Sequence, residues 1–261
     1  MAKLCSLFSG SDGNCTYISI RNVAFLVDAG VSARSILNAL EKRGYKKEAV
    51  KGIFITHEHT DHVKGLKNLL KTINVPVYAS EKTLAALTEK EILDGSHTLI
   101  AVDGEFEVQN IKVTRFATSH DCEGSSGYRF NLSGTCSVAV CTDLGFVSDE
   151  VLENLKGCRG MVIESNHDLK MLRDGPYPHE LKLRVGSDHG HLSNNACAAV
   201  LPTLFKSGTT RFILGHISRQ NNTHAVALSC AKAALMDIGA VAGEDYLIFC
   251  AGQYGCGEVV L

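Results

Sequence analysis

Residues 57–62 constrain the fold of this chain more than any other feature, because they place four metal-binding side chains in one short segment. Side chains alternate between the two faces of an extended chain, so His57 and His59 point the same way and can share one ion. If the chain then turns, Asp61 and His62 can reach a second ion. The segment therefore predicts a metal site that depends on a change of direction in the backbone.

This segment lies where a strand is expected to end. An apolar run over residues 52–56 predicts a buried strand, and the pattern of residues 63–70 predicts a helix. Imidazole and carboxylate ligands suit zinc, manganese or iron. Polar surface residues near a strand end are the competing interpretation, but four ligand-type side chains within six residues favour the metal site.

Longer motifs along the whole chain narrow the interpretation. They are residues 6–18 (SLFSGSDGNCTYI), 26–30 (LVDAG), 118–122 (TSHDC), 141–145 (CTDLG), 164–168 (ESNHD), 177–196 and 214–222 (LGHISRQNN). Together with residues 57–62, which form an HxHxDH motif, they resemble the metallo-β-lactamase superfamily of binuclear hydrolases, and in particular its YycJ/WalJ-like group. The resemblance implies an α/β (α+β) fold, an αββα sandwich of two mixed sheets covered by helices. No linker or repeat divides the chain, so we expect a single domain over residues 1–261.

The resemblance also implies ligands for two divalent metal ions. Carried onto matching positions, the ligands are His57, His59 and His120 for the first ion, Asp61, His62 and His216 for the second, and Asp143 as the bridge. The distant ligands each follow an apolar run, so one edge of the sheets can gather them. Asp28 matches an acidic residue that orients the ligands, although a turn residue is the alternative.

The donor set indicates which reactions to expect. It contains only nitrogen and oxygen, without a cysteine thiolate, which argues against antibiotic hydrolysis and leaves zinc, manganese and iron open. After the carboxylates neutralise part of the charge, the two ions keep a positive charge that favours a phosphate-like substrate. They also lower the pKa of bound water, which supplies the nucleophile.

We therefore expect a binuclear phosphodiesterase, an exonuclease that cleaves DNA through a metal-bridging hydroxide. The expected catalytic residues are Asp61 and His191, since His191 resembles a histidine of the tRNase Z group that assists the leaving group. A small-molecule hydrolase of the same fold, a thioesterase of the glyoxalase II type or a cyclic phosphodiesterase, is the alternative. A non-catalytic metal-binding scaffold is a third possibility, which the complete ligand set disfavours.

Candidate substrate contacts are less specific than the metal ligands. They are Ser11 and Asn14 in a glycine-rich loop, and Lys182, Arg184 and Arg219 in the longer motifs. Turn geometry and solvated charge explain these residues equally well. The net charge of −2 and the pI near 6.6 do not indicate tight binding of duplex nucleic acid.

The apolar runs and the cysteines indicate where in the cell the protein is expected. The N-terminus lacks a long apolar run, and no stretch approaches 18 apolar residues, so neither a signal peptide nor a membrane span is expected. The ten cysteines form no CxxC pair. We expect a cytoplasmic protein with reduced thiols, in which Cys122 is the one thiol expected near the site, since it lies two residues from His120.

Overall fold

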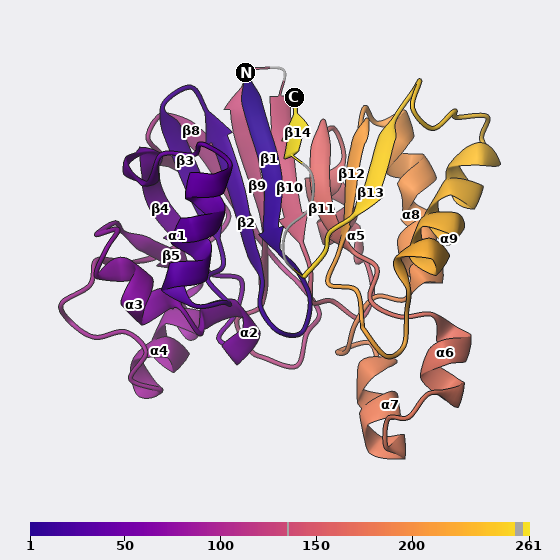
Figure 1. Ribbon diagram of the computed structural model, residues 1–261, viewed down its shortest axis with the longest axis horizontal. Coiled ribbons are helices and arrows are strands. Elements are labelled where there is room, and N and C mark those ends of the chain that lie inside the picture. The colour runs from indigo at the N-terminus through magenta and orange to yellow at the C-terminus, as the bar shows by residue number, and fades with distance from the viewer. Residues whose placement is uncertain (135, 254–257) are drawn as a thin grey trace.

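The computed structural model describes residues 1–134, 136–253 and 258–261, and its strands form two seven-stranded sheets (Figure 1). The first sheet, in spatial order, contains β14 (Glu258–Val260), β1 (Ala2–Phe8), β2 (Cys15–Ile20), β3 (Val23–Val27), β4 (Val50–Phe54), β5 (Val77–Ala79) and β6 (Leu99–Ala101). The second contains β13 (Leu247–Cys250), β12 (Arg211–Gly215), β11 (Gly160–Glu164), β10 (Cys136–Cys141), β9 (Ser126–Ser133), β8 (Ile111–Ala117) and β7 (Glu105–Val108). Each sheet mixes parallel and antiparallel pairs.

The two sheets pack face to face through a buried aromatic cluster. Phe54 on β4 lies 4.9 Å from Phe130 on β9, and Phe25 on β3 lies 5.7 Å from Phe130, measured between ring centroids. All three side chains are completely buried. Burial of rings of this size is a large favourable term, so the sheet interface holds the two halves of the chain together.

Helices cover the outer face of each sheet. The first half contributes α1 (Ala33–Lys42), α2 (Thr60–Val63), α3 (Leu66–Leu70) and α4 (Glu81–Glu89). The second contributes α5 (Asp149–Leu155), α6 (Leu169–Asp174), α7 (His179–Val185), α8 (Asn194–Lys206) and α9 (His224–Met236). Separate apolar clusters join each set of helices to its own sheet. The predicted αββα sandwich is confirmed.

Some local expectations were wrong. The helix predicted over residues 63–70 is two short helices, α2 and α3, so Asp61 and His62 lie on a helix that begins at Thr60. The N–H of Gly65 donates to the Ala29 carbonyl oxygen at 2.8 Å and so leaves the helical hydrogen-bond pattern. A Cβ atom on Gly65 would lie 1.9 Å from the Val31 carbonyl oxygen, so only glycine permits this approach. Helices α6 and α7 and strand β6 were not predicted. The apolar run at residues 257–261 also predicts a strand from the sequence. The structure has β14 there, and Gly257 lies outside the described residues.

In Figure 1, α2, α6 and α7 lie at the end of the sandwich opposite to the two termini. Strands β4, β10 and β12 run toward that end, and the segments that follow them carry most of the predicted ligands. No helix in the described part of the chain is long and apolar enough to cross a membrane.

Candidate metal centre

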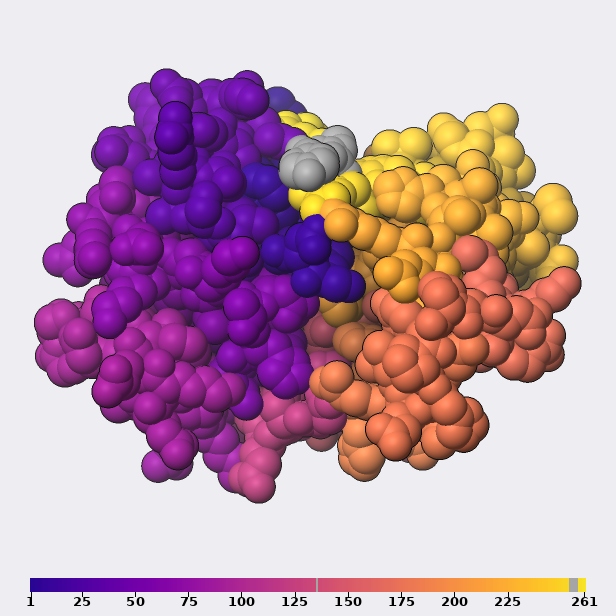
Figure 2. All heavy atoms as spheres, turned by 60° about the horizontal axis from the view of Figure 1, so that its bottom comes forward, coloured from indigo at the N-terminus to yellow at the C-terminus, as the bar shows by residue number. Residues whose placement is uncertain are grey.

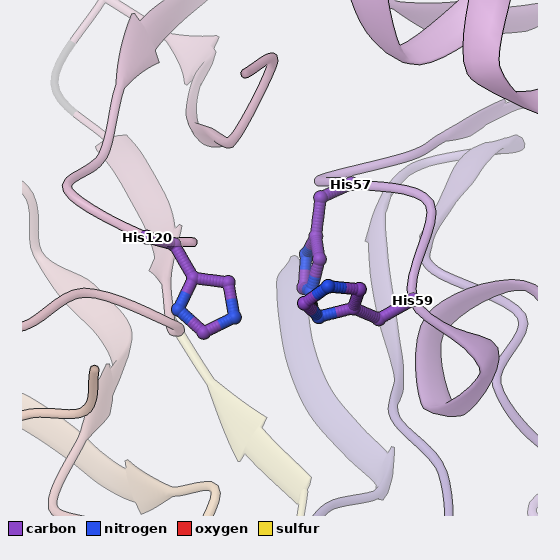
Figure 3. A group of neighbouring side chains, drawn as sticks. All are labelled: His57, His59 and His120. Carbon is purple, nitrogen blue, oxygen red and sulfur yellow. Dashed lines mark hydrogen bonds between the residues drawn. The ribbon is translucent and has the colours of Figure 1, made fainter. Parts of the chain in front are cut away.

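Three histidines from both sheets turn their rings toward one another (Figure 3). His57 and His59 follow β4, and His120 follows β8. Nε2 of His57 lies 3.1 Å from Nδ1 of His59, and the rings of His57 and His120 are 5.0 Å apart. Nδ1 of His120 lies 3.0 Å from the Gly190 carbonyl oxygen, and this contact orients the ring. We call these residues the three-histidine group.

A second group, called here the acidic group, contains Asp61, His62 and His216. Oδ2 of Asp61 lies 3.4 Å from Nε2 of His62 and 3.4 Å from Nε2 of His216. Burial raises the pKa of Asp61, but the neighbouring His62 and His216 outweigh this effect and hold the pKa below its usual range. Asp61 is therefore a carboxylate, the form that binds a cation.

Asp143 stands between the two groups. Its Oδ2 lies 3.4 Å from Nε2 of His62, and its Oδ1 lies 3.3 Å from Nδ1 of His216 and 3.9 Å from Nε2 of His120. The side chain is almost fully buried. This position matches the bridging role that the sequence analysis expects of Asp143.

Two buried atoms in this region test whether cations fit. Oδ2 of Asp143 and Nε2 of His216 have no hydrogen-bond partner among the residues that the structure describes. Leaving a buried polar atom unpaired costs about 1–3 kcal/mol, and more when the atom is charged. A divalent cation beside these atoms would compensate that cost, and imidazole nitrogen and carboxylate oxygen are its ordinary ligands. The residues therefore fit a divalent ion in each group, with Asp143 between them.

The backbone turns sharply at three of these positions. Asp28, Asp143 and His216 have φ angles of 65°, 61° and 52°, in the left-handed region that residues other than glycine rarely adopt. Each follows a strand by one or two residues, after β3, β10 and β12 respectively. Such backbone strain costs on the order of 1–3 kcal/mol per residue and is concentrated at functional sites. Here it directs side chains from the strand ends into one cluster.

Asp28 and Thr56 orient two of the histidines. Nδ1 of His62 lies 2.8 Å from Oδ2 of Asp28, and the Thr56 hydroxyl lies 3.0 Å from Nδ1 of His57. Asp28 also accepts the backbone N–H of Thr56 at 2.9 Å. Because these contacts engage Nδ1, Nε2 of His57 and of His62 is directed toward the cluster. Metal-binding histidines are ordinarily oriented by an outer partner in this way.

Glu164, at the end of β11, is a site residue that the sequence analysis missed. Its Oε1 lies 2.9 Å from Nδ1 of His191 and 2.7 Å from Nδ1 of His216. Its Oε2 accepts the backbone N–H groups of Leu144 and Leu192, both at 3.1 Å. The rule that ligands follow apolar runs could have selected it, since Glu164 ends the run MVIE. Glu164 thus joins the predicted catalytic His191 to the acidic group.

His191 lies at the edge of the cluster, where substrate can reach it. Its ring is 5.1 Å from the ring of His120 and 5.0 Å from that of His216. The side chain is 19% exposed, whereas those of His57 and His62 are fully buried. Ser193, two residues after His191, caps α8 by accepting the N–H of Ala196 at 3.2 Å, and this cap fixes the start of the helix.

The candidate substrate residues Ser11, Asn14 and Lys182 lie in different surroundings. Asn14 is buried against the acidic group, with its Nδ2 3.1 Å from Nε2 of His62, while Ser11 is exposed. Lys182 donates to the Arg173 carbonyl oxygen at 2.8 Å and so joins α7 to α6.

Both arginines pair with acidic residues near the cluster. Arg184 pairs with Asp121, next to His120, and Arg219 pairs with Asp12 in the loop that contains Ser11. Cys122 is half-buried, and burial raises the pKa of its thiol to about 11, so it stays protonated at neutral pH.

Comparisons with known proteins identify the family of this chain. The model of the beta-lactamase superfamily domain matches residues 24–217. The chain is 35% identical over 244 residues to exodeoxyribonuclease YycJ of Bacillus anthracis, covering 93% of this chain and 92% of the relative. It is 34% identical over 251 residues to exodeoxyribonuclease WalJ of Streptococcus pneumoniae, covering 95% of this chain and 93% of the relative.

A solved structure with low sequence identity shares the fold. It is the zinc-bound PqqB of Methylobacterium extorquens, which is 16% identical, with a TM-score of 0.71 over 100% of both chains. The fold, the clustered histidines and carboxylates, and the family model define a metallo-β-lactamase-fold protein. The chain belongs to the metallo-β-lactamase superfamily, and within it to the YycJ/WalJ-like group.

Proposed function

We propose that this protein is a binuclear metal-dependent phosphodiesterase that removes nucleotides from DNA ends. The observation that carries the proposal is the buried cluster of histidines and carboxylates around Asp143. Two of its buried ligand atoms have no hydrogen bond within the part of the chain that the structure describes. The exodeoxyribonuclease relatives, each covered over more than nine-tenths of its length, support DNA as the substrate. Zinc, manganese and iron are the metals that the donor set favours.

The surface around the cluster can accept a chain. In Figure 2 the surface is recessed between the N-terminal half and the C-terminal part that contains α6 and α7. Arg184 and Arg219 each pair with an acidic residue in this region. Local cations of this kind can contact phosphates even though the net charge of the chain is −2.

Asp61, Asp143 and the histidines would hold two divalent ions, which lower the pKa of bound water and stabilise charge on the phosphate. The side chain of Asp61 is 24% exposed, so its carboxylate can accept a hydrogen bond from the attacking water and orient it. Asp61 acts in this scheme as a ligand and as a positioning group. The two roles require the ionised carboxylate that the neighbouring histidines favour.

His191 would protonate the leaving oxygen. Glu164 accepts the Nδ1–H of His191, which leaves Nε2 as the atom that can carry a proton toward substrate. Glu164 holds the ring in one orientation, much as an acidic partner orients a general-acid histidine in other hydrolases. Proton transfer of this kind contributes about 10²–10⁴ in rate.

A nuclease assay tests the proposal. Protein loaded with manganese, zinc or magnesium is incubated with single- and double-stranded DNA and RNA, labelled at either end. We expect stepwise release of nucleotides from DNA, and none from Asp143→Ala. An absence of cleavage with all three metals would refute the proposal, whereas hydrolysis of S-lactoylglutathione alone would support the thioesterase alternative.

The role of His191 has a separate test that uses leaving groups of different basicity. A p-nitrophenolate leaves without a proton, whereas a nucleoside alkoxide needs one. His191→Ala should therefore lose about 10²-fold or more in kcat on DNA but much less on bis-p-nitrophenyl phosphate. Equal losses on both substrates would contradict a general-acid role.

Two further expectations belong to the same proposal. A DNA-degrading activity is consistent with a cytoplasmic location. A single folding unit over residues 1–261 is consistent with ligands that come from both sheets, since neither half alone holds the complete set.

A further inference from the structure

His59 differs from the other ligand histidines in how its ring is held. Its Nδ1 faces the cluster, 3.1 Å from Nε2 of His57 (Figure 3), and its Nε2 forms no hydrogen bond within residues 1–134, 136–253 and 258–261. The other four have an outer polar partner on Nδ1: the Thr56 hydroxyl for His57, Asp28 for His62, the Gly190 carbonyl oxygen for His120 and Glu164 for His216. Because metal-binding histidines ordinarily have such a partner, the groups around Nε2 of His59 decide how its ring is oriented.

Asp121, the residue after His120, directs one carboxylate oxygen toward this nitrogen. Its Oδ1 lies 3.9 Å from Nε2 of His59 and 3.2 Å from Nε2 of His120. Its Oδ2 contacts both Nε and Nη2 of Arg184 on α7. Two donors on one oxygen fix the carboxylate, so Asp121 presents its other oxygen to the three-histidine group.

The position of the proton on His59 determines what Asp121 can contact. A neutral imidazole carries one N–H, so a ring that binds an ion through Nδ1 carries its proton on Nε2. The 3.9 Å separation exceeds an ordinary N–H···O distance by about 1 Å, which a small rotation of either side chain closes. In the described part of the chain, Asp121 belongs to none of the groups whose ligand atoms lie within 4.8 Å of one another. Its carboxylate is therefore placed to accept from His59 and not to bind the ion.

Helix α7 supports the three-histidine group at a second point. The Gly190 carbonyl oxygen lies 3.0 Å from Nδ1 of His120. A Cβ atom on Gly190 would lie 2.2 Å from the Arg184 carbonyl oxygen, so only glycine permits this packing against the end of α7. The same turn of α7 thus supports His120 through Gly190 and contacts Asp121 through the Arg184 side chain.

We propose that Asp121 is the positioning residue of His59: Oδ1 accepts the Nε2–H of His59 while Nδ1 holds the first ion, and Arg184 holds the carboxylate through Oδ2. The inference rests on the proposed binuclear metal centre and does not depend on the substrate. A carboxylate acceptor fixes the ring and makes the imidazole a stronger ligand, and loss of such a partner costs about 10–100-fold in metal affinity.

The test measures zinc affinity, by competition with a coloured chelator, in wild type and Asp121→Asn. The amide has nearly the shape of the carboxylate and keeps one oxygen for Arg184, so its N–H₂ group faces His59. We expect the affinity of one of two zinc ions to fall about 10–100-fold, and that of the other to stay unchanged. Glu123→Gln, the same chemical change at an exposed residue two positions further on, is the matched control and should leave both affinities unchanged. Wild-type affinity for both ions in Asp121→Asn would overturn the inference.

Double-mutant cycles distinguish a positioning residue from a ligand. If Asp121 acts through His59, Asp121→Asn should add little to the loss of zinc affinity in His59→Gln. Arg184→Gln should lower zinc affinity less than Asp121→Asn does, and should add little to it, because Arg184 acts through Asp121. Additive losses in the first cycle would show that Asp121 acts independently of His59 and would overturn the inference. Additive losses in the second, or an unchanged affinity in Arg184→Gln, would overturn the role of Arg184.

These outcomes are separate from the outcome of the proposed function. In each of them wild type still binds two zinc ions. Failure of the proposed function would appear in wild type itself, as fewer than two bound ions or as zinc-loaded protein that cleaves no DNA.

Discussion

The two halves of the metal centre share the same ring chemistry but differ in charge. Burial lowers the pKa of His57 and His59, and the neighbouring imidazoles lower it further. Burial acts in the same direction on His62 and His216, but the carboxylates around them, Asp143 first, raise their pKa well above the ordinary value. The identity of the side chain therefore does not decide its proton affinity here.

This difference indicates what each half contributes. In the three-histidine group, His57 and His59 present neutral nitrogen donors, so they bind a cation without losing protons. The acidic group concentrates negative charge, and a cation there replaces protons on His62 and His216. Asp143 belongs to both halves, and changes at single residues can separate the two contributions.

The largest effect is expected at the shared residue. Asp143→Ala removes a ligand from both halves and leaves their cations to repel each other without a carboxylate between them. We expect activity on DNA to fall about a thousandfold or more, with loss of both metals. Asp149→Asn, an exposed acidic residue on α5, is the control and should retain metal and activity. Full metal content in Asp143→Ala would contradict the bridging assignment.

The next effect separates Glu164 from the ligands themselves. The carboxylate of Glu164 contacts two imidazole nitrogens and accepts hydrogen bonds from two backbone N–H groups. Glu164→Gln replaces one of its oxygens with an N–H₂ group, which cannot accept these hydrogen bonds. We expect kcat on DNA to fall about a hundredfold, within the range of general-acid contributions, while metal content stays close to wild type. Loss of metal in parallel with activity would show that Glu164 serves the acidic group alone.

A smaller change should affect the histidines that Asp28 and Thr56 orient. Asp28→Asn weakens the partner of Nδ1 of His62, and metal affinity should fall about 10–100-fold. Thr56→Val removes the hydroxyl near His57 and His62 and should have a smaller effect, because it removes no charge. Competition with a coloured chelator measures both affinities. An equal effect of the two variants would argue against a charge-based role for Asp28.

The smallest expected effect is the pH dependence of stability without metal. The pKa of His57 is lower in the folded protein than in the unfolded chain. As pH falls below about 6.5, the unfolded chain takes up a proton that the folded protein does not, so the free energy of unfolding decreases. His216 has a raised pKa, so its stabilisation is present below about pH 6.5 and is lost as pH rises through its folded pKa.

Thermal melting of the metal-free variants distinguishes the opposite pH dependences of His57 and His216. His57→Asn should flatten the loss of Tm toward acid pH, whereas His216→Asn should lower Tm more at pH 6 than at pH 9. Parallel Tm profiles for the two variants would remove the electrostatic distinction between the halves.

Much of the fold and of the ligand set could be predicted from local pattern. Apolar runs of strand length located most strands. The resemblance assigned Asp143 and His216 as ligands, and each follows such a run. Helices α6 and α7 were not predicted because they have only six and seven residues, which is too short to show a clear helical periodicity. The predicted helix is divided at Gly65 because its N–H donates to the carbonyl oxygen of Ala29, a residue distant in the chain.

The sequence by itself determined the chemistry of the donors, since the HxHxDH run and the strand-end residues specify imidazole and carboxylate groups whatever lies near them. Only the tertiary structure decided how those donors differ from each other. It brought Glu164 to both His191 and His216, which lie 27 and 52 residues further along the chain. Proton affinity and exposure depend on neighbours from distant segments and on burial, and local sequence does not encode those neighbours.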